Sequence, residues 1–236
     1  MSFAWLLNAL VLQRPNATLG VRARASLAAA DVYAAAAVRK WSWVGPFDDD
    51  HGNGMADQHE IEQQVLQTGA PPSTNVSYLG KTGEIVSWRT YQDGSEASAP
   101  HLPLSALLPT RELNTGSVGF AMARTYCAAA AGCLRRIHVG MSDRGRLWLL
   151  SATGTHAPQE IVTDNLLHGL TADEHETAVT LQQGWSVLLI KTLSTFAADT
   201  IAINGSRSSG WGGGTSTLGL GILNGTNEWG VSLAIA

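Results

Sequence analysis

The sequence predicts an all-β protein, a two-sheet sandwich preceded by a helical lead-in. After residue 40, short apolar segments with a period of two alternate with clusters of Gly, Pro, Asn and Asp, as in half-buried strands joined by turns. The chain has 236 residues, of which 44% are hydrophobic and 14% charged, so it can bury one large core. We therefore expect a helical lead-in over 1–40 and one β-sandwich domain over 41–236.

The lead-in is expected to be helical because residues 17–40 are rich in Ala and end in Arg39 and Lys40, where cations favour the helix dipole. Before it, the apolar run FAWLLNALVL is too short to cross a bilayer. That run is either part of a packed amphipathic helix or a signal-peptide core with a cleavage site at residues 23–25. We favour the helix, because no Lys or Arg precedes the run.

The strongest strand patterns follow residue 83, and the last of them places alternate apolar residues on one face. Tight turns are predicted at 142–145, with the Asp and Gly of a hairpin, and at 182–184. Residues 92–116 are expected to be a surface connection and the Gly-rich 204–227 a flexible one. The predicted strands cover 84–91, 117–127, 134–141, 146–150, 177–181, 185–193 and 229–236.

The segment WSWVGPF opens the predicted domain. Trp41 and Trp43 point the same way on a strand and are expected to lie in the core, because such large rings must bury much area. Gly45 and Pro46 are expected to end this strand, with Phe47 turning back onto the core.

An acidic loop follows, and its spacing matches that of an EF-hand calcium loop. Imidazole is a poor ligand for a hard cation, and no flanking helix pair is evident, so a solvated acidic turn is the alternative. If calcium binds, it would stiffen the sandwich. The matching positions are Asp49, His51, Asn53, Gly54, Met55, Asp57 and Glu60.

Cys127 and Cys133 are the only cysteines and lie six positions apart, so they either close a short loop as a disulfide or remain free thiols. Four Asn-x-Ser/Thr sequons accompany them. Together these features favour a secreted or lumenal protein, with an intracellular location as the alternative.

Charge and motifs exclude several functions. A net charge of −4 and a pI near 5.9 give no basic surface for nucleic acid or an anionic membrane. The sequence contains no HExxH, GxSxG or P-loop motif, so no catalytic residue is predicted. His168 and residues 173–176 lie close in sequence without a metal-ligand spacing, and are expected to form a charged surface turn.

The order of the motifs WSWVGPFDDDHGNGM, YLGKTGEIVSW, GFAMARTY, VGMSDRGRLWL, LQQGWSVLLIKTL and WGVSLAIA resembles a galactose-binding-like, jelly-roll β-sandwich module. Such modules occur in large bacterial multidomain proteins beside helical repeats, transglutaminase-like or carbohydrate-active domains. The resemblance spans about 41–236 and implies a jelly-roll fold. Residues 149–151, Ser186 and His59 depart from the family pattern, which alters the expected ligand site, whereas Glu62 is retained.

The resulting functional prediction is a non-catalytic, carbohydrate-binding-like or scaffolding module with a glycan or protein partner. The alternatives are a structural interaction subunit that has lost ligand binding and a hydrolase with an unrecognised carboxylate pair. Aromatic rings stack on sugars and polar side chains bind hydroxyls. Trp148 and Trp185 could instead be core residues, which we favour for both. The candidate ligand residues are Asp143, Arg144, Trp148, Trp185 and Trp211.

Overall fold

The computed structural model describes residues 38–49, 53–92, 101–108, 110, 113, 116–166, 174–194 and 231–235. The expected lead-in up to residue 37, the Gly-rich segment 204–227 and Trp211 lie outside this part of the chain. Lys40, which we expected to end a helix, instead begins the first strand.

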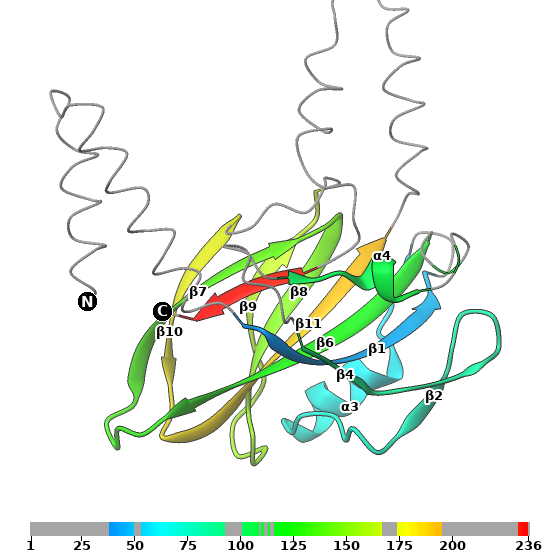
Figure 1. Ribbon diagram of the computed structural model, residues 1–236. Helices are drawn as coiled ribbons and strands as arrows, with labels where there is room; N and C mark the ends of the chain where they lie inside the picture. Colours follow the sequence, from blue (N-terminus) through cyan, green and yellow to red (C-terminus); the bar gives the residue numbers. More distant parts are fainter. Residues whose placement is uncertain are drawn as a thin grey trace, which may run out of the picture.

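The larger of the two main sheets has six strands, all antiparallel to their neighbours, in the order β4-β1-β6-β11-β8-β9 (Figure 1). The two longest strands, β6 and β11, lie side by side at its centre and pair along their whole length. The strands are β4 (Arg89–Gln92), β1 (Lys40–Asp48), β6 (Ser117–Cys127), β11 (Gly184–Ser194), β8 (Arg144–Ser151) and β9 (Gln159–Asp164).

The second main sheet has four strands in the order β10-β7-β12-β5. A separate two-stranded hairpin, β2-β3, and two short helices complete the described structure. These elements are β10 (His175–Leu181), β7 (Cys133–Met141), β12 (Val231–Ile235), β5 (His101–Leu102), β2 (Ser77–Leu79), β3 (Ile85–Ser87), α3 (Glu60–Thr68) and α4 (Leu104–Leu107).

The two main sheets pack face to face around one hydrophobic core. Side chains of the six-stranded sheet, such as Trp43, Ala121 and Leu188, join Val139 and Leu181 of the four-stranded sheet in one cluster of buried residues. The predicted β-rich, two-sheet architecture is therefore confirmed, and so is the burial of Trp41 and Trp43 at 1% and 3% exposure.

The opposite face of the six-stranded sheet is also buried. A second cluster joins Phe120 and Leu189 of the sheet to Ile61 and Val65 of α3 and to Tyr78 of the β2-β3 hairpin. Figure 1 shows α3 beside β1 and β4. Burial on both faces explains why β11 reads as a nearly continuous apolar run and not as a strict alternation.

The tight turns predicted at 142–145 and 182–184 are present, but they are not hairpin turns. The first joins β7 to β8 and the second joins β10 to β11, and in both cases the two strands belong to different sheets. Asp143 takes a left-handed conformation with φ of 57° in the first turn. These short connections carry the chain across the sandwich from one sheet to the other.

Three sequence expectations about individual segments were wrong. The strand β1 does not end at Gly45-Pro46, but passes through this cis peptide with a register shift against β6. The segment 84–91 is not one strand, because β3 pairs with β2 and β4 pairs with β1. The connection 92–116 is not wholly on the surface, because Leu102 and Leu104 lie in the main core.

The helix α3 begins with a capping box. The Nδ1 of His59 accepts a hydrogen bond from the backbone N–H of Ile61 at 3.2 Å, and the carboxylate of Glu62 accepts one from the N–H of His59 at 3.1 Å. Gly69 ends the helix in a left-handed conformation with φ of 67°. Both ends are therefore fixed by local interactions.

No helix in the described ranges has the length and apolarity that crossing a bilayer requires.

Candidate functional site

A surface hollow lies at one end of the sandwich, where the β8-β9 connection meets the β10-β11 turn. Its volume is about 550 Å³, within the range of about 300–1,000 Å³ that is common for small-ligand sites. Both polar and apolar side chains line it. They include Leu149, Ser151, Thr155, His156, Gln182 and Trp185.

The most prominent side chain at this hollow is that of Trp185, which is 57% exposed. It pairs across the strands with Tyr126, which is 52% exposed, and their ring centroids lie 5.2 Å apart at an interplanar angle of 55°. Our preferred interpretation of Trp185 as a core residue was therefore wrong. Its position at the start of β11 shares a face with Val187 and Leu189, but those two contribute to the second core whereas Trp185 does not.

Three hydroxyl side chains line the hollow together with Trp185, whereas Tyr126 is not among the lining residues. The side-chain oxygen of Ser151 lies 2.9 Å from that of Thr153 and 3.1 Å from that of Thr155, and the two Thr oxygens are 3.1 Å apart. The backbone N–H of Ala152 donates to the carbonyl of Trp185 at 3.2 Å, which fixes this loop against β11. The hollow thus combines an aromatic wall with groups that can donate and accept hydrogen bonds.

A disulfide closes the loop that follows Tyr126. Cys127, next to Tyr126, is bonded to Cys133, so the connection from β6 to β7 is a closed loop. The side-chain amide of Gln183 donates to the carbonyl of Ala128 in this loop at 3.4 Å. This hydrogen bond connects the closed loop that follows Tyr126 to the turn that precedes Trp185.

A positively charged side chain lies on the same face of β6 as Tyr126. Arg124 is exposed and is two residues from Tyr126, so the two side chains project from one face of the strand. It is paired in register with Val187 of β11, one step further from the hollow than Trp185. A ligand that extended along this face would meet a guanidinium group after the aromatic rings.

The ligand residues predicted from the sequence do not lie together on an exposed surface. Trp148 is 3% exposed and packs in the second core, so its ring has no free face for a sugar. Asp143 is 6% exposed and forms a bridge with Leu193, and Arg144 is partly buried. Burial of Trp148 is the alternative that we favoured, and it follows from the cover that α3 and the β2-β3 hairpin provide.

The predicted calcium loop is only partly described, because His51 lies outside the described residues. Asp49 is 5% exposed, and its Oδ1 accepts a hydrogen bond from the N–H of Gly54 at 3.0 Å. Burial raises the pKa of Asp49, whereas this hydrogen bond opposes the rise. The remaining positions are spread out, with Met55 in the second core, Asn53 and Asp57 exposed, and Glu60 at the start of α3. Calcium binding here stays a prediction.

A buried ion pair fastens α3 to the sheet. The ammonium of Lys191 on β11 donates to the carboxylate of Glu62, and it also donates to the carbonyl of Asp57 at 3.0 Å. The two charged side chains are 0% and 2% exposed. Burial lowers the pKa of Lys191, while the charge of Glu62 opposes that shift. A pair so enclosed is out of reach of a ligand and serves the fold.

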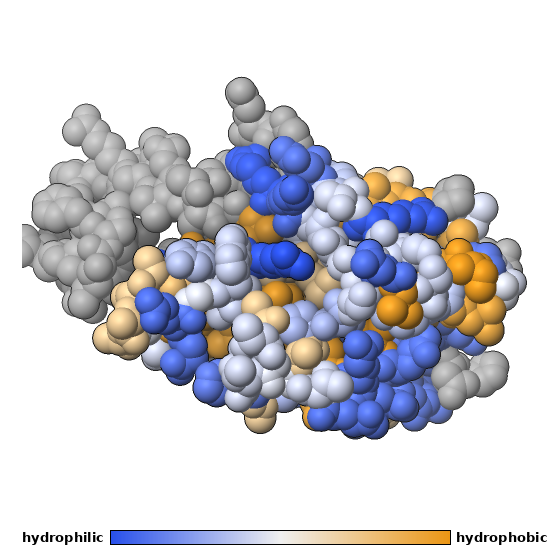
Figure 2. Space-filling model, turned by 90° about the horizontal axis from the view of Figure 1, so that it is seen from below, coloured by the Kyte–Doolittle hydropathy of each residue, from blue (hydrophilic) through white to orange (hydrophobic). Residues whose placement is uncertain are grey.

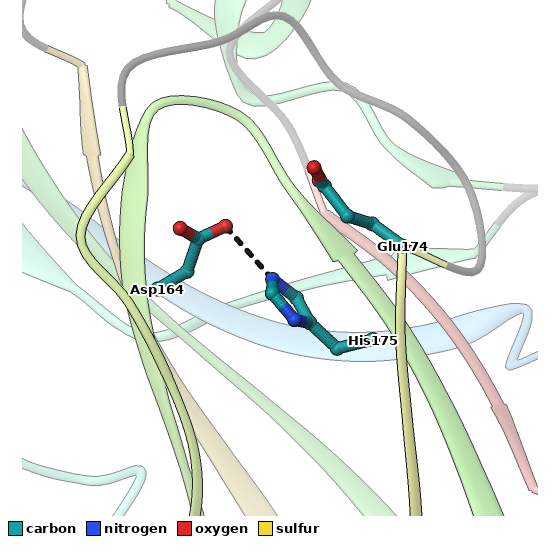
Figure 3. Close-up of side chains that lie close together, drawn as sticks. All are labelled: Asp164, Glu174 and His175. Atoms are coloured by element: carbon teal, nitrogen blue, oxygen red, sulfur yellow. Dashed lines mark hydrogen bonds and ion pairs between the residues drawn. The ribbon is translucent and has the colours of Figure 1, made fainter.

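One further group of ionisable side chains lies at the ends of β9 and β10. The His175 Nε2 is 2.8 Å from the Asp164 Oδ2, and Glu174 lies beside them (Figure 3). We expected residues 173–176 to form a charged surface turn, but His175 begins a strand and contacts a buried carboxylate. His168 and Asp173 lie outside the described residues.

The surface seen in Figure 2 carries several separate hydrophobic patches divided by hydrophilic residues. Elsewhere on the protein, Leu79 and Ile85 of the β2-β3 hairpin face each other across the strands and are 66% and 69% exposed. This apolar pair is one part of the described surface that a protein partner could cover.

Tyr126 and the hydroxyl residues at the hollow were missed in the sequence. The available signal was a Trp directly after a turn, in QQGWS, together with a Tyr directly before a Cys, in RTYC. Residues at the ends of strands project beyond a covered core, so aromatic residues there are more accessible than those in the middle. Their cross-strand pairing needed the register of β6 against β11, which the sequence alone does not provide.

Comparison with known proteins gives no family assignment. No protein-family model matches the chain, and no curated protein matches it. Solved structures do match, among them the β-glucuronidase of Ruminococcus gnavus, with a TM-score of 0.37, 10% identity and coverage of 67% of this chain and 21% of that chain. The same values hold for that enzyme with D-glucaro 1,5-lactone, and identity is 8% for its complex with uronic isofagomine.

The chain therefore spans about a fifth of the length of the enzymes that it matches, with 21% of their chain covered. A likeness this distant carries no argument about activity or ligand.

Proposed function

We propose that this protein is a non-catalytic, carbohydrate-binding β-sandwich module, and that the hollow beside Trp185 and Tyr126 is its glycan site. The observation that carries the proposal is the exposed aromatic pair next to a polar-lined hollow, in a protein that buries most of its other large aromatic side chains in the described ranges.

The chemistry of the hollow suits a sugar. A pyranose ring presents C–H groups on its faces, which stack on aromatic rings, and hydroxyls on its rim, which need hydrogen-bond partners. Trp185, which lines the hollow, and its neighbour Tyr126 provide the rings, while Ser151, Thr153 and Thr155 of the same lining provide hydroxyls. Arg124 on the same face would favour glycans that carry a carboxylate or sulfate.

The proposed fold type is a jelly roll of the galactose-binding-like kind. Of the five connections between β6 and β11, four cross between the two main sheets, and only the one from β8 to β9 stays within a sheet, a pattern that supports a jelly roll. The disulfide between Cys127 and Cys133 supports a secreted or lumenal location, where such bonds persist.

A second candidate function is that of a structural interaction subunit. The exposed pair of Leu79 and Ile85 on the β2-β3 hairpin favours it, because a protein partner that covered these two side chains would remove apolar surface from water. This surface belongs to a different element from the hollow, so the two functions can be tested separately.

The test of glycan binding is a glycan array followed by calorimetric titration of the hits. Trp185→Ala should weaken binding by roughly fivefold to 150-fold, if stacking of a sugar on one aromatic ring contributes about as much as the roughly 1–3 kcal/mol of base stacking. Leu134→Ala is the matched control, since Leu134 is 71% exposed on the other sheet. Trp148→Ala is unsuitable, because it would remove a core ring.

Three outcomes decide between the candidates. Specific binding that Trp185→Ala removes and Leu134→Ala preserves supports the glycan site. No glycan hit, together with self-association that Leu79→Ser reduces, supports the interaction subunit. Release of sugar from polysaccharide substrates would contradict the non-catalytic assignment and indicate a hydrolase.

A further inference from the structure

The group of Asp164, Glu174 and His175 brings three metal-ligating side chains together outside the proposed glycan site. One ligand atom from each residue lies within 4.8 Å of the other two. Figure 3 shows the carboxylate of Asp164 facing the ring of His175, with Glu174 on the adjoining strand end. In the described part of the chain, this is the one group of three His, Cys, Asp or Glu side chains that meets this distance.

Asp164 is buried and fixed in place. Its side chain is 2% exposed, and its Oδ1 accepts a hydrogen bond from the backbone N–H of Leu166 at 2.9 Å. The Oδ2 lies 2.8 Å from the Nε2 of His175, whose side chain is 29% exposed. The Asp164 donor is therefore enclosed and held by a backbone hydrogen bond, whereas the imidazole of His175 is partly exposed.

The three donors come from both sheets of the sandwich. Asp164 ends β9, an edge strand of the six-stranded sheet, while His175 begins β10, an edge strand of the four-stranded sheet. Glu174 directly precedes β10. An ion held by all three would connect the two sheets at edges that do not otherwise share a backbone ladder.

The donor set points to a particular class of ion. One imidazole nitrogen with two carboxylate oxygens suits zinc and related first-row transition metals, whereas calcium prefers oxygen ligands throughout. Ligand atoms around a tetrahedral zinc lie roughly 3–4 Å apart, so the present spacing needs only a small adjustment. Two carboxylates close to one imidazole also give the site the negative charge that attracts a cation.

We propose that Asp164, Glu174 and His175 bind a divalent transition-metal ion of the zinc class, with water completing its coordination, and that this ion joins the edges of the two sheets. The site is structural: it would fix the β9 and β10 ends against each other. It is independent of the glycan-binding proposal, because none of its three residues lines the hollow.

The test uses the full, tag-free chain after treatment with a chelator and exhaustive dialysis. Zinc is titrated calorimetrically, and cobalt serves as a spectroscopic substitute whose visible bands report coordination. His175→Gln and Glu174→Gln remove one donor each from partly or fully exposed positions, so both variants should fold. Glu176→Gln is the matched control, because Glu176 lies on the other face of β10 and pairs with Arg136.

The expected result is saturable binding of one zinc ion per chain, weakened at least about tenfold in each of His175→Gln and Glu174→Gln and unchanged in Glu176→Gln. Zinc should raise the melting midpoint of the parent protein and not that of His175→Gln, and calcium should not compete. The proposal is overturned if zinc does not bind saturably, or if both donor variants bind it as tightly as the parent.

Discussion

His59 is a histidine that the fold keeps neutral. Its ring lies among Phe47, Phe120 and Tyr78, with a centroid distance of 4.1 Å to Phe47. Burial, and to a smaller extent the nearby charge of Lys191, lower the pKa of His59 to about 4. The neutral ring is needed because its Nδ1 accepts the hydrogen bond that begins α3.

This environment predicts a loss of stability in acid. In the unfolded chain His59 binds a proton near pH 6.5, whereas in the folded protein it does so only near pH 4. As the pH falls, the unfolded state therefore takes up the proton first. The contribution of His59 to the free energy of unfolding is complete above pH 6.5 and falls by roughly 3 kcal/mol as the pH drops to 4. Urea unfolding of the parent and of His59→Asn across this range measures it.

Asn can still cap the helix but does not titrate, so the difference between the two stability curves isolates His59 from the carboxylates. The two curves should diverge as the pH falls from 6.5 to 4. Curves that remain parallel over that interval would show that the ring is not held neutral.

Individual tryptophans show what the sequence can and cannot predict at this scale. Trp41 and Trp43 were correctly placed in the core from strand alternation and size. Trp148 and Trp185 have the same local pattern, yet one is 3% and the other 57% exposed. The difference arises because α3 and the β2-β3 hairpin cover the sheet over Trp148 but not over Trp185. This cover depends on tertiary packing, which the local sequence pattern does not reveal.

At the level of elements, α3 covers a face of the six-stranded sheet that would otherwise be exposed, and it thereby contributes to the second core. It has only a few apolar positions, of which Ile61 and Val65 are buried, so its pattern is too short to distinguish from a polar loop. The sequence therefore did not predict this helix. Strands with long apolar runs, such as 117–127 and 185–193, were predicted nearly to their ends.

The attachment of α3 depends on the pair of Lys191 and Glu62. Removing one member leaves the other charge buried without its partner, so Lys191→Met should lower the free energy of unfolding by about 3–5 kcal/mol. The double variant Glu62→Gln with Lys191→Met should lose much less than the sum of the single losses, since no buried charge remains. Denaturant unfolding of the four proteins measures this coupling.

The control is an ion pair of the same kind on the surface. Arg136 and Glu176 are each 42% exposed, so Arg136→Met should cost at most about 1 kcal/mol. Additive losses at Lys191 and Glu62, or a loss there no larger than at Arg136, would contradict the proposed role of the buried pair.

At the scale of the whole molecule, two cores share one sheet. The six-stranded sheet packs against the four-stranded sheet on one side and against α3 and the β2-β3 hairpin on the other. The sequence predicted the β class and the sandwich. It did not predict which strands share a sheet, because the turns at 142–145 and 182–184 have hairpin composition but cross between sheets.

The same arrangement explains where a ligand can bind. Both faces of the central strands β6 and β11 are buried along most of their length, and their paired ends at Tyr126 and Trp185 emerge from the cover. The hollow lies at that end of the sandwich. Ligand recognition is therefore proposed at a strand end, and not at the acidic loop of residues 49–60.

The most direct test of that placement follows the indole N–H resonances of Trp185 and Trp148 by NMR during titration with a glycan. The account predicts that the Trp185 signal shifts progressively and saturates, while the Trp148 signal, from a buried ring, stays in place. A saturable glycan interaction that leaves the Trp185 resonance unmoved, or the absence of binding by any glycan tested, would contradict it.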